Sequence, residues 1–461
     1  MEDLTGRLAR QRAAFLREGA PPLAARRGSL AKLRAALLAR RGAFESALDA
    51  DFGHRSRHET AIMEVLPLLW GIDYLRRNLR RFARPERRHV ALPMRLARAR
   101  IESQPLGVIG IISPWNYPLS LALMPLATAL AAGNRAMLKP SELTPATSEL
   151  LASLVADTFP ADEVTVVLGD ASAGASFAAL PFDHLFFTGS TAVGRAVMRA
   201  ASEHLVPVTL ELGGKSPVLV DRGQPLDRVA SGIAYGKLAN GGQTCVAPDY
   251  ALLHEDDVDA FVVAWGKAVA ALYPGGPDSP DYSSIVNVRH YERLRGLLAD
   301  AQAQGARIVE ASPVRRPHTL APALVFNIHD GMRIAHEEIF GPVLPVVTYR
   351  DLDEAIAFVN ARPRPLALYY FGSSAANRTR VLTRTTSGGV VVNGTIVHYV
   401  QDDLPFGGVG PSGFGAYHGI EGFRAFSHRK AVFDQGRWNG SALLRPPFGP
   451  LTNRILSWML R

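Results

Sequence analysis

Apolar residues recur at helical spacing through the first part of the chain. Between about residues 4 and 84 they stand three or four positions apart, as at Leu30, Leu33, Leu37 and Leu38. A stripe with this period forms the buried face of an amphipathic helix. The sequence therefore predicts a helical N-terminal region.

After residue 106 the pattern changes to short apolar runs separated by turns and helical segments. Five such runs precede residue 213, and they span residues 108–112, 135–139, 164–168, 184–187 and 208–212. Strands that alternate with helices form a parallel sheet with helices on both faces. We expect a second series of this kind from Pro217 to about Val392, in which residues 226–240 form a helix leading into the loop of Cys245. The predicted fold class is α/β, with ligands bound beyond the carboxyl ends of the strands.

Three further segments have local predictions. We expect a two-stranded arm between Pro85 and Pro105. The longest apolar stretch, residues 119–133, is interrupted by polar residues and proline and is shorter than the roughly 20 residues of a membrane span, so it predicts a buried helix. Thr144 and Pro145 are typical of a helix start, as N-cap and first helical residue.

Composition narrows the class of protein. The chain has 461 residues, of which 47% are hydrophobic and 20% charged, as in an ordinary globular protein. The net charge is +9, and ten arginines fall between Arg76 and Arg100, which raises the question of a nucleic-acid partner. No zinc-ligand spacing, RNP-like aromatic string or helix-turn-helix signal accompanies them. We interpret the arginines as a solvated helix face and expect no nucleic-acid binding.

The chain has a single cysteine, Cys245. This count excludes an intramolecular disulfide and a multi-cysteine metal cluster, and we expect no metal site. A free thiol fits a reducing compartment, and the acidic start of the chain lacks the basic and apolar pattern of a secretory signal. We therefore expect a cytoplasmic protein.

Cys245 is the first candidate for chemistry. It lies in the string Gly241-Gly-Gln-Thr-Cys-Val-Ala-Pro248, whose small residues leave the sulfur accessible to a substrate. A lone cysteine is more often a small buried hydrophobe, and this string alone favours that interpretation. The loops that follow the predicted strands favour a nucleophilic cysteine instead.

Polar side chains follow the predicted strands. Asn116 stands between two prolines, where it is either a turn residue or a rigid amide donor for an oxyanion. Lys139 and Glu142 follow the second strand and could hold a ribose by hydrogen bonds, although the string is short. Glu211 closes an apolar strand, so partial desolvation would raise its pKa towards the range of a general base; its alternative role is an ion-pair partner.

A glycine-bracketed turn, Gly189 to Gly194, opens a helix after the fourth strand. Helix N-terminal amides attract phosphate, but the same string also suits a plain strand-to-helix turn. It matches neither G-x-G-x-x-G nor a P-loop, because Arg195 occupies the position of the P-loop lysine. The string Gly214-Lys215-Ser216 also fails as a P-loop, since the first glycine would fall at Thr209.

Taken together, six strings resemble the aldehyde dehydrogenase superfamily in their order along nearly the whole chain. They are Pro114-Trp-Asn-Tyr-Pro118, Lys139-Pro-Ser-Glu142, Phe187-Thr-Gly-Ser190, Glu211-Leu-Gly-Gly-Lys215, Gly242-Gln-Thr-Cys245 and Glu337-Glu-Ile-Phe-Gly-Pro342. The strings Cys245-Val-Ala-Pro-Asp-Tyr250 and Phe406-Gly-Gly-Val-Gly-Pro-Ser-Gly413 resemble its class 3 branch. Within that branch, Asp51-Phe-Gly-His-Arg-Ser-Arg-His58 and residues 361–370 resemble the bacterial coniferyl aldehyde dehydrogenases.

The resemblance implies NAD-dependent oxidation of an aldehyde to a carboxylic acid, with NADP as an alternative cofactor. It implies that Cys245 is the nucleophile, that Asn116 and the Cys245 backbone amide hold the oxyanion, and that Glu211 activates water against the thioester. An unperturbed thiol is only slightly ionised near neutral pH, so we expect the site to favour the thiolate, through a helix N-terminus or through Glu211 as base. We expect an aromatic or medium-chain aldehyde, with residues 397–402 contributing to its pocket.

The resemblance also implies a set of cofactor-binding residues. They are Trp115, Lys139, Glu142, Gly189, Ser190, Thr191, Ala192, Val193, Gly194, Leu212, Glu338 and Phe340. Lys139 and Glu142 would hold the adenosine ribose, and Glu338 and Phe340 would position the nicotinamide ribose and ring.

The implied fold has a Rossmann-like cofactor-binding domain (residues 1–84 and 106–213) and an α/β catalytic domain (residues 214–392). A small β element for bridging and oligomerisation (residues 85–105 and 393–440) would join two subunits of a homodimer, and residues 441–461 would form a C-terminal tail.

Alternatives remain for the activity and for the tail. A coenzyme-A-acylating dehydrogenase would use the same cysteine, but Glu211 favours hydrolysis; an inert structural relative would be expected to lose Cys245, Glu211 or Asn116, and all three are present. In the tail, Leu451, Ile455 and Met459 share one helical face. We favour docking of this face on the protein over contact with a membrane surface.

Overall fold

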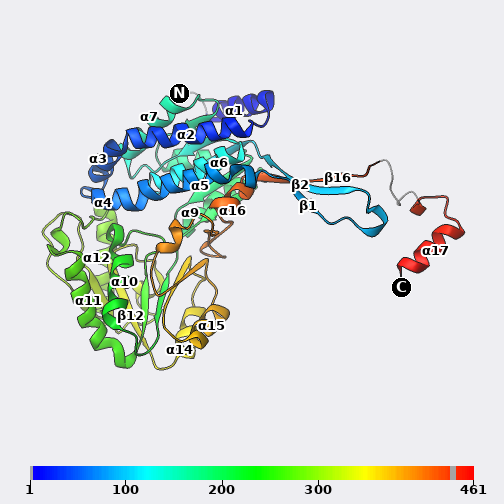
Figure 1. Ribbon diagram of the computed structural model, residues 1–461. Coiled ribbons are helices and arrows are strands. Elements are labelled where there is room, and N and C mark those ends of the chain that lie inside the picture. Colours follow the sequence, from blue (N-terminus) through cyan, green and yellow to red (C-terminus); the bar gives the residue numbers. More distant parts are fainter. Residues whose placement is uncertain (1–3, 437–442, 461) are drawn as a thin grey trace.

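The computed structural model describes residues 4–436 and 443–460. It contains a six-stranded and a seven-stranded sheet, each packed with helices, and a three-stranded arm that projects from the body (Figure 1). The strands within the two large sheets are parallel except at one edge of each. The α/β fold class predicted from the alternating pattern is confirmed.

The six-stranded sheet contains the five strands expected before residue 213. In spatial order its strands are β15 (Gly413–Phe414), β7 (Val208–Glu211), β6 (His184–Thr188), β3 (Val108–Ile112), β4 (Arg135–Lys139) and β5 (Val164–Val166). The strand β15 pairs antiparallel with β7 and was not predicted, because two residues carry no periodic signal. It brings the glycine-rich segment after residue 406 against the strand that ends in Glu211.

Helices cover both faces of this sheet, since alternate strand residues enter separate cores. Ile109 and Leu138 belong to one hydrophobic cluster, whereas Val108 and Met137 belong to another. Such alternation places successive side chains on opposite faces. The helices of this part are α1 (Leu4–Glu18), α2 (Leu23–Ala39), α3 (Arg41–Phe52), α4 (Arg57–Thr60), the π-helix η1 (Ala61–Val65), α5 (Leu66–Phe82), α6 (Ser120–Ala132), α7 (Pro145–Thr158), α8 (Ala171–Ala178), α9 (Thr191–Ser202) and α16 (Gly419–Ala425).

The helix expected between residues 119 and 133 is confirmed as α6, whose residues from Ala122 to Ala132 are all buried. The predicted start of α7 is also confirmed, with Thr144 at the N-cap position and Pro145 as the first helical residue. Thr144 makes no side-chain capping bond, and Asp51 of α3 instead accepts hydrogen bonds from the backbone amides of Ala146 and Thr147, at 2.9 and 2.8 Å. A carboxylate from another helix thus satisfies the free amides of this helix end.

The seven-stranded sheet forms the second body. In spatial order its strands are β10 (Arg307–Glu310), β11 (Ala323–Phe326), β12 (Val343–Tyr349), β9 (Tyr250–His254), β8 (Pro217–Val220), β13 (Ala367–Phe371) and β14 (Gly389–Val392). Its α-helices are α10 (Leu226–Leu238), α11 (Val258–Leu272), α12 (Val288–Ala303), α13 (Arg333–His336), α14 (Leu352–Asn360) and α15 (Ala375–Arg384). Short 3-10 turns lie at η3 (Ala239–Gly242), η4 (Glu255–Asp257), η5 (Gly276–Asp278) and η6 (Val397–Val400).

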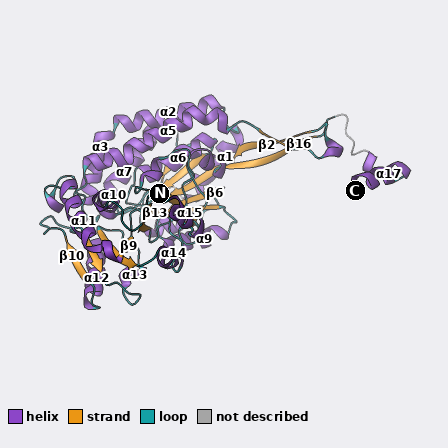
Figure 2. Ribbon diagram, turned by 60° about the horizontal axis from the view of Figure 1, so that its bottom comes forward, coloured by secondary structure: helices purple, strands orange, loops and turns teal. Residues whose placement is uncertain are grey.

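The arm has three strands rather than the two expected. It consists of β1 (Glu86–Arg88) and β2 (Arg98–Pro105), joined by a loop that holds the 3-10 turn η2 (Leu92–Met94), and of β16 (Ser427–Asp434), which pairs antiparallel with β2 over eight residues. Two views show β2 and β16 leaving the body together (Figures 1 and 2). The prediction missed β16 because its partner lies more than three hundred residues earlier in the chain.

The C-terminal helix α17 (Pro450–Met459) lies beyond the far end of the arm and away from both sheets (Figure 1). Leu451 and Trp458 are exposed, so the expected docking of this helix on its own chain is not seen. The expected boundary between residues 440 and 441, and the terminal Arg461, lie outside the described residues. Within residues 4–436 and 443–460, no helix is both long and apolar enough to span a bilayer.

Candidate active site

Cys245 follows a turn in which three successive residues have positive φ angles. Asn240, Gly241 and Gly242 have φ values of 53°, 59° and 77°, which are left-handed conformations in succession. A side chain at Gly242 would overlap the backbone of Gly341, so glycine is required there both for its φ and for this close approach. The helix α10 ends at Leu238, two residues before the end expected from the sequence, because this turn begins. The turn presents Cys245 as a half-buried free thiol.

Asn116 lies in the loop after β3 and is directly tied to the cysteine loop. Its side-chain Nδ2 donates to the backbone oxygen of Gln243 at 3.1 Å. In return, the Asn240 side chain donates to the backbone oxygen of Asn116 at 2.9 Å. Asn116 is buried. Its side chain binds Gln243, which lies two residues before Cys245 in the cysteine loop. The two predicted residues are therefore brought together.

Glu211 ends β7 as an isolated buried carboxyl group. Only 3% of the residue is exposed, and neither carboxylate oxygen has a hydrogen-bond partner among the described residues. Burial raises the pKa of Glu211 well above its usual value, because the charged form loses its hydration. The prediction of a raised pKa is confirmed, and the alternative of an ion-pair partner is wrong for the described residues, which give Glu211 no cation.

The surroundings of Cys245 oppose its ionisation. Burial, with added contributions from the carboxyl groups of Glu338 and Glu211, raises the pKa of the thiol to about 12. The largest of these effects oppose a thiolate at rest, and of the two expected routes to the thiolate, Glu211 as base stays a prediction. Ionisation of Cys245 requires a base to receive the proton as the sulfur attacks.

A cleft of about 450 Å³ opens at the carboxyl ends of β3, β4 and β6, where ligands of parallel sheets bind. Six of the expected cofactor-binding residues line it: Trp115, Lys139, Glu142, Gly189, Ser190 and Val193. The buried ammonium group of Lys139 donates to the backbone oxygen of Pro140 at 2.9 Å and lies 3.6 Å from a carboxylate oxygen of Glu142. Burial lowers the pKa of Lys139, while Glu142 opposes that shift.

The residues of this cleft fit a dinucleotide. A cation and an exposed carboxylate stand at one end, and α9 begins beside Ser190, whose hydroxyl caps the helix by accepting from the amide of Val193 at 3.4 Å. The buried hydroxyl of Thr188 and the Nε2 of His290 have no partner among the described residues, and both belong to residues that line the cleft. Sequence reasoning missed His290, which packs against Trp115 at 4.9 Å between ring centroids. Its position in α12, far along the chain, gave no signal.

Six of the expected cofactor-binding residues do not line the cleft, and four of them, Thr191, Ala192, Gly194 and Leu212, lie on or next to α9 and β7. Thr191 donates its hydroxyl hydrogen to the backbone oxygen of Pro411 at 3.2 Å, and Ala192 is exposed on the first turn of α9. Gly194 and Leu212 face each other, since a Cβ on Gly194 would lie 2.7 Å from the Leu212 side chain. Their contact with a cofactor stays a prediction.

Glu338 and Phe340 reach the site from the segment after α13. The Phe340 ring meets Trp115 edge-on at 5.4 Å, and its backbone has a φ of 51°, which is strained for a residue with a bulky side chain. The pKa of Glu338 is raised to about 7, first by burial and then by Asp249, while the Gly214 amide, Lys215 and Arg293 act in the opposite direction. Glu338 is thus a second titratable carboxyl group near Cys245.

Cys245 also lines a narrow hollow of about 50 Å³. Its lining is mainly aromatic and aliphatic, and consists of Met63, Tyr117, Ser120, Leu121, Thr244, Cys245, Val246, Tyr399, Phe406, Tyr417 and His418. Tyr399 comes from the expected segment 397–402, whereas most other members were missed because they come from helices and loops spread over the chain. Burial lowers the pKa of His418 to about 4, so its imidazole is neutral near neutral pH.

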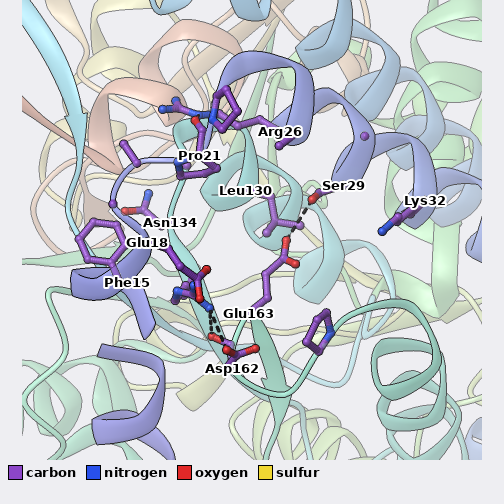
Figure 3. A pocket seen from close by; sticks show the side chains of 18 residues that line it. Phe15, Glu18, Pro21, Arg26, Ser29, Lys32, Leu130, Asn134, Asp162 and Glu163 are labelled. Carbon is purple, nitrogen blue, oxygen red and sulfur yellow. Dashed lines mark hydrogen bonds and ion pairs between the residues drawn. The ribbon is translucent and has the colours of Figure 1, made fainter. Parts of the chain in front are cut away.

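A separate hollow of about 680 Å³ lies where α1 and α2 meet the edge of the six-stranded sheet (Figure 3). Several of its polar groups have partners: Arg135 binds Glu18 at 2.5 Å, and Ser29 donates to Glu163 at 3.0 Å. Cys245 is not among the residues that line it. In the part of the chain that the structure describes, no cluster of three or more His, Cys, Asp or Glu side chains could hold a metal ion.

Comparison with known proteins identifies the family. The pattern of the aldehyde dehydrogenase family matches residues 3–432. The chain belongs to the aldehyde dehydrogenase family. It is 50% identical over 466 residues to the coniferyl aldehyde dehydrogenase of a Pseudomonas species, covering 100% of this chain and 96% of that protein. It is 40% identical over 453 residues to aldehyde dehydrogenase family 3 member A2 of Mus musculus, covering 97% and 92%.

Solved structures agree with this aldehyde dehydrogenase in fold. The substrate-bound state of Staphylococcus aureus AldH has a TM-score of 0.95 at 37% identity, with 100% of both chains covered. A Mycobacterium tuberculosis aldehyde dehydrogenase complexed with NAD+ has a TM-score of 0.83 at 29% identity, covering 92% of this chain and 88% of that one. This aldehyde dehydrogenase is an NAD(P)-dependent oxidoreductase of the class 3 branch that converts an aldehyde to a carboxylic acid. The coenzyme-A-acylating alternative is not favoured.

Proposed function

We propose that this aldehyde dehydrogenase oxidises aromatic aldehydes of the coniferyl type, with medium-chain aliphatic aldehydes as the second class. The observation that carries the proposal is that Cys245 lines a hollow together with the rings of Tyr117, Tyr399, Phe406 and Tyr417. Aromatic rings favour edge-on or offset contact with another ring, so such a slot suits a flat substrate. Relatives called coniferyl aldehyde dehydrogenase, at 49% and 50% identity, support the same class.

In the proposed mechanism, Cys245 is the nucleophile. As the thiol loses its proton, the sulfur adds to the aldehyde carbonyl and an oxyanion develops. The Nδ2 of Asn116 and the backbone amide of Cys245 donate to that oxygen, an effect worth about 10²–10³ in rate for one donor in other enzymes. When bound, the nicotinamide cofactor accepts the hydride that leaves the substrate carbon, and a thioester remains on Cys245.

Glu211 is the proposed base for hydrolysis of the thioester. A carboxylate without hydrogen-bond partners and with a raised pKa can take a proton from water near neutral pH. The side chain lies at the end of β7, near enough to Cys245 to raise the pKa of its thiol. Attack of the activated water releases the carboxylic acid and the free thiol.

The proposed cofactor site comprises the twelve residues implied by the family strings. Lys139 and Glu142 would hold the adenosine ribose, and Glu338 and Phe340 the nicotinamide end. A carboxylate at Glu142 repels a 2′-phosphate, so NAD is the proposed physiological cofactor. In the proposed domain organisation, residues 1–84 and 106–213 bind the cofactor and residues 214–392 carry Cys245.

The decisive experiment measures NADH formation with coniferyl aldehyde, benzaldehyde and hexanal in parallel, with and without coenzyme A. Cys245→Ala is the catalytic control, and Gly266→Ala, in an open position on α11, is the matched surface control. We expect turnover without coenzyme A in the wild type and Gly266→Ala, none in Cys245→Ala, and the highest kcat/KM for coniferyl aldehyde. Turnover that requires coenzyme A would reject hydrolysis, and a preference for hexanal would reject the aromatic substrate.

We propose a cytoplasmic homodimer, with the arm and the segment after Asn393 bridging the subunits. The arm projects from its own body, and exposed Leu92, Leu96 and Phe433 give it apolar surface for a partner. The single free thiol supports a reducing compartment. Light scattering tests the assembly: a monomeric mass at working concentration would contradict the proposed dimer, and deletion of residues 437–461 reports whether the tail contributes to it.

A further inference from the structure

Arg55 and Glu64 form an ion pair in the interior of the protein. Both side chains are fully inaccessible, and Nη2 of Arg55 lies 3.1 Å from Oε1 of Glu64. A buried ion pair contributes little net stability, because the desolvation of two charges offsets their attraction. Arg55 follows α3 and Glu64 lies within η1, and neither belongs to the six strings that resemble the superfamily, although Arg55 lies in the string 51–58. Net stability therefore does not explain why this ion pair is buried here.

Both members bind the loop that carries Asn116. Nη1 of Arg55 donates to the backbone oxygen of Asn116 at 3.1 Å. A carboxylate oxygen of Glu64 accepts from the backbone amides of Leu119 and Ser120, each at 2.9 Å. The ion pair thus holds the loop at Asn116 and again at the start of α6, a few residues further on.

Arg55 also contacts the rings on either side of this loop. Its guanidinium carbon lies 4.7 Å from the ring centroid of Phe52 and 5.1 Å from that of Tyr117. The Tyr117 hydroxyl in turn shares a hydrogen bond of 2.7 Å with the hydroxyl of Thr244, the neighbour of Cys245. The guanidinium is therefore enclosed by groups that touch both the asparagine and the cysteine loops.

Two hydrogen bonds, rather than one, hold the backbone of Asn116 in place. Its backbone oxygen accepts from both Arg55 and Asn240, and the two donors approach from different segments. Asn240 is itself held by Glu59, which accepts from its backbone amide at 3.0 Å. With Arg55 removed, the peptide of Asn116 keeps only the donor from the cysteine loop, and it is free to rotate with that loop.

We propose that Arg55, held in place by Glu64, is a positioning residue that fixes the peptide of Asn116 so that its side-chain amide points at the developing oxyanion. The inference rests on the proposed role of Asn116 in that oxyanion site. An oxyanion donor acts only when its nitrogen is about 2.7–3.1 Å from the oxygen of the transition state. A small rotation of the Asn116 peptide would move Nδ2 out of that range without disturbing the ground state.

The first test removes both charges together, because either charge alone would be left buried and unpaired. In the double variant Arg55→Met/Glu64→Gln, we expect kcat to fall by about 10–100-fold, while the KM for NAD and for the aldehyde changes less than about twofold. The matched control is Arg26→Met. Arg26 is also a buried arginine that binds backbone oxygens, those of Pro21 at 2.8 Å and Ala132 at 2.9 Å, but it lies at the distant hollow of Figure 3. Its kcat should match that of the wild type.

The second test asks whether Arg55 acts through Asn116. We expect the double variant to lose little further activity when it is combined with Asn116→Ala, because the donor that Arg55 positions is then absent. Independent, multiplicative losses of kcat would overturn the proposal. So would wild-type kcat in the double variant while Asn116→Ala is impaired, whereas full activity of Asn116→Ala would reject the proposed oxyanion role itself.

A conservative variant covers the case in which the double variant does not fold. Arg55→Lys keeps a buried cation for Glu64 but cannot reach Asn116, Glu64 and both rings with one planar group. We expect its thermal midpoint to stay near that of the wild type, with kcat reduced and not restored by higher aldehyde concentration. Combining Arg55→Lys with Asn116→Ala allows the same comparison of combined and separate losses of kcat. Wild-type kcat in Arg55→Lys would contradict a positioning role.

Discussion

A methyl group on Gly213 would overlap both carboxylate oxygens of Glu338. The loop that follows Glu211 therefore touches the second carboxyl group of the site directly. The φ of Gly213 is not among the left-handed values, so the close approach, rather than backbone conformation, requires glycine here.

Gly213→Ala tests the position of Glu338. The new methyl group meets the end of a side chain rather than backbone, so the chain should fold while the carboxylate moves aside. We expect kcat to fall by about tenfold or more, because small displacements of positioning groups are costly in catalysis. Gly266→Ala, which meets no atom within 4 Å, is the control and should keep full activity. Unchanged kcat in Gly213→Ala would show that Glu338 tolerates displacement.

Glu211→Gln tests the proposed base. The variant keeps the shape of the side chain but cannot accept a proton from water. We expect one rapid turnover of NADH formation, followed by steady-state turnover reduced by about 10²-fold or more, while Lys139→Ala has a much smaller effect on kcat. Rapid-mixing measurements separate the two phases. A larger loss of the slow phase in Glu338→Gln than in Glu211→Gln would transfer the role of base to Glu338.

The charge near Cys245 predicts a change in thiol reactivity. Glu338 raises the pKa of the thiol, and its own pKa is about 7, so the repulsion acts above that pH. Glu338→Gln removes the negative charge, lowers the pKa of Cys245 and should increase the rate of alkylation by iodoacetamide at about pH 9. The rates should converge below about pH 6, where Glu338 is already neutral. Slower alkylation in the variant at about pH 9 would contradict this electrostatic account.

His184 predicts a loss of stability in acid. It is buried with its Nε2 3.0 Å from the Thr209 hydroxyl, and burial lowers its pKa from 6.5 to about 4. The unfolded chain therefore binds a proton between these pH values that the folded chain does not, so stability is present above about pH 6.5 and is lost as the pH falls towards 4. The shift corresponds to about 3 kcal/mol at its full extent.

Thermal midpoints measured from about pH 7 to pH 4 test this linkage. His184→Gln should lower the midpoint at neutral pH yet show a shallower decline towards acid. The matched control is His89→Gln, which replaces an exposed histidine of the arm and should follow the wild-type curve. Parallel curves for His184→Gln and the wild type would show that another group controls the acid transition.

The parts of the site that lie at strand ends could be predicted from sequence. Asn116, Lys139 and Glu211 each follow an apolar run, and parallel strands bring their carboxyl ends to one edge of the sheet. Cys245 was predictable only together with these strand ends and the family strings, because its own string favoured an inert buried thiol. These signals are local, so a single stretch of sequence contains them.

The supporting contacts could not be predicted, because each depends on residues far apart in the chain. Arg55 lies in a string that resembles the family, but nothing in that string indicates its hydrogen bond to Asn116. Asp51 likewise caps α7 from a distance of 95 residues in sequence, while the adjacent Thr144, which has the favoured residue type, does not. The ionisation of Cys245 could not be predicted either, since it depends first on burial and then on the carboxyl groups of Glu338 and Glu211, which are far apart in the chain.

The pairing of β16 with β2 has a consequence for the order of events during synthesis. The N-terminal strand of the arm leaves the ribosome long before its eight-residue partner at Ser427–Asp434 has been made. Until then β2 has only the three residues of β1 beside it, and one of its edges offers free backbone groups to any other nascent chain. The arginines in the first half of this strand, Arg98 and Arg100, place charge on it, and they would keep neighbouring chains on a polysome apart while the chain is completed.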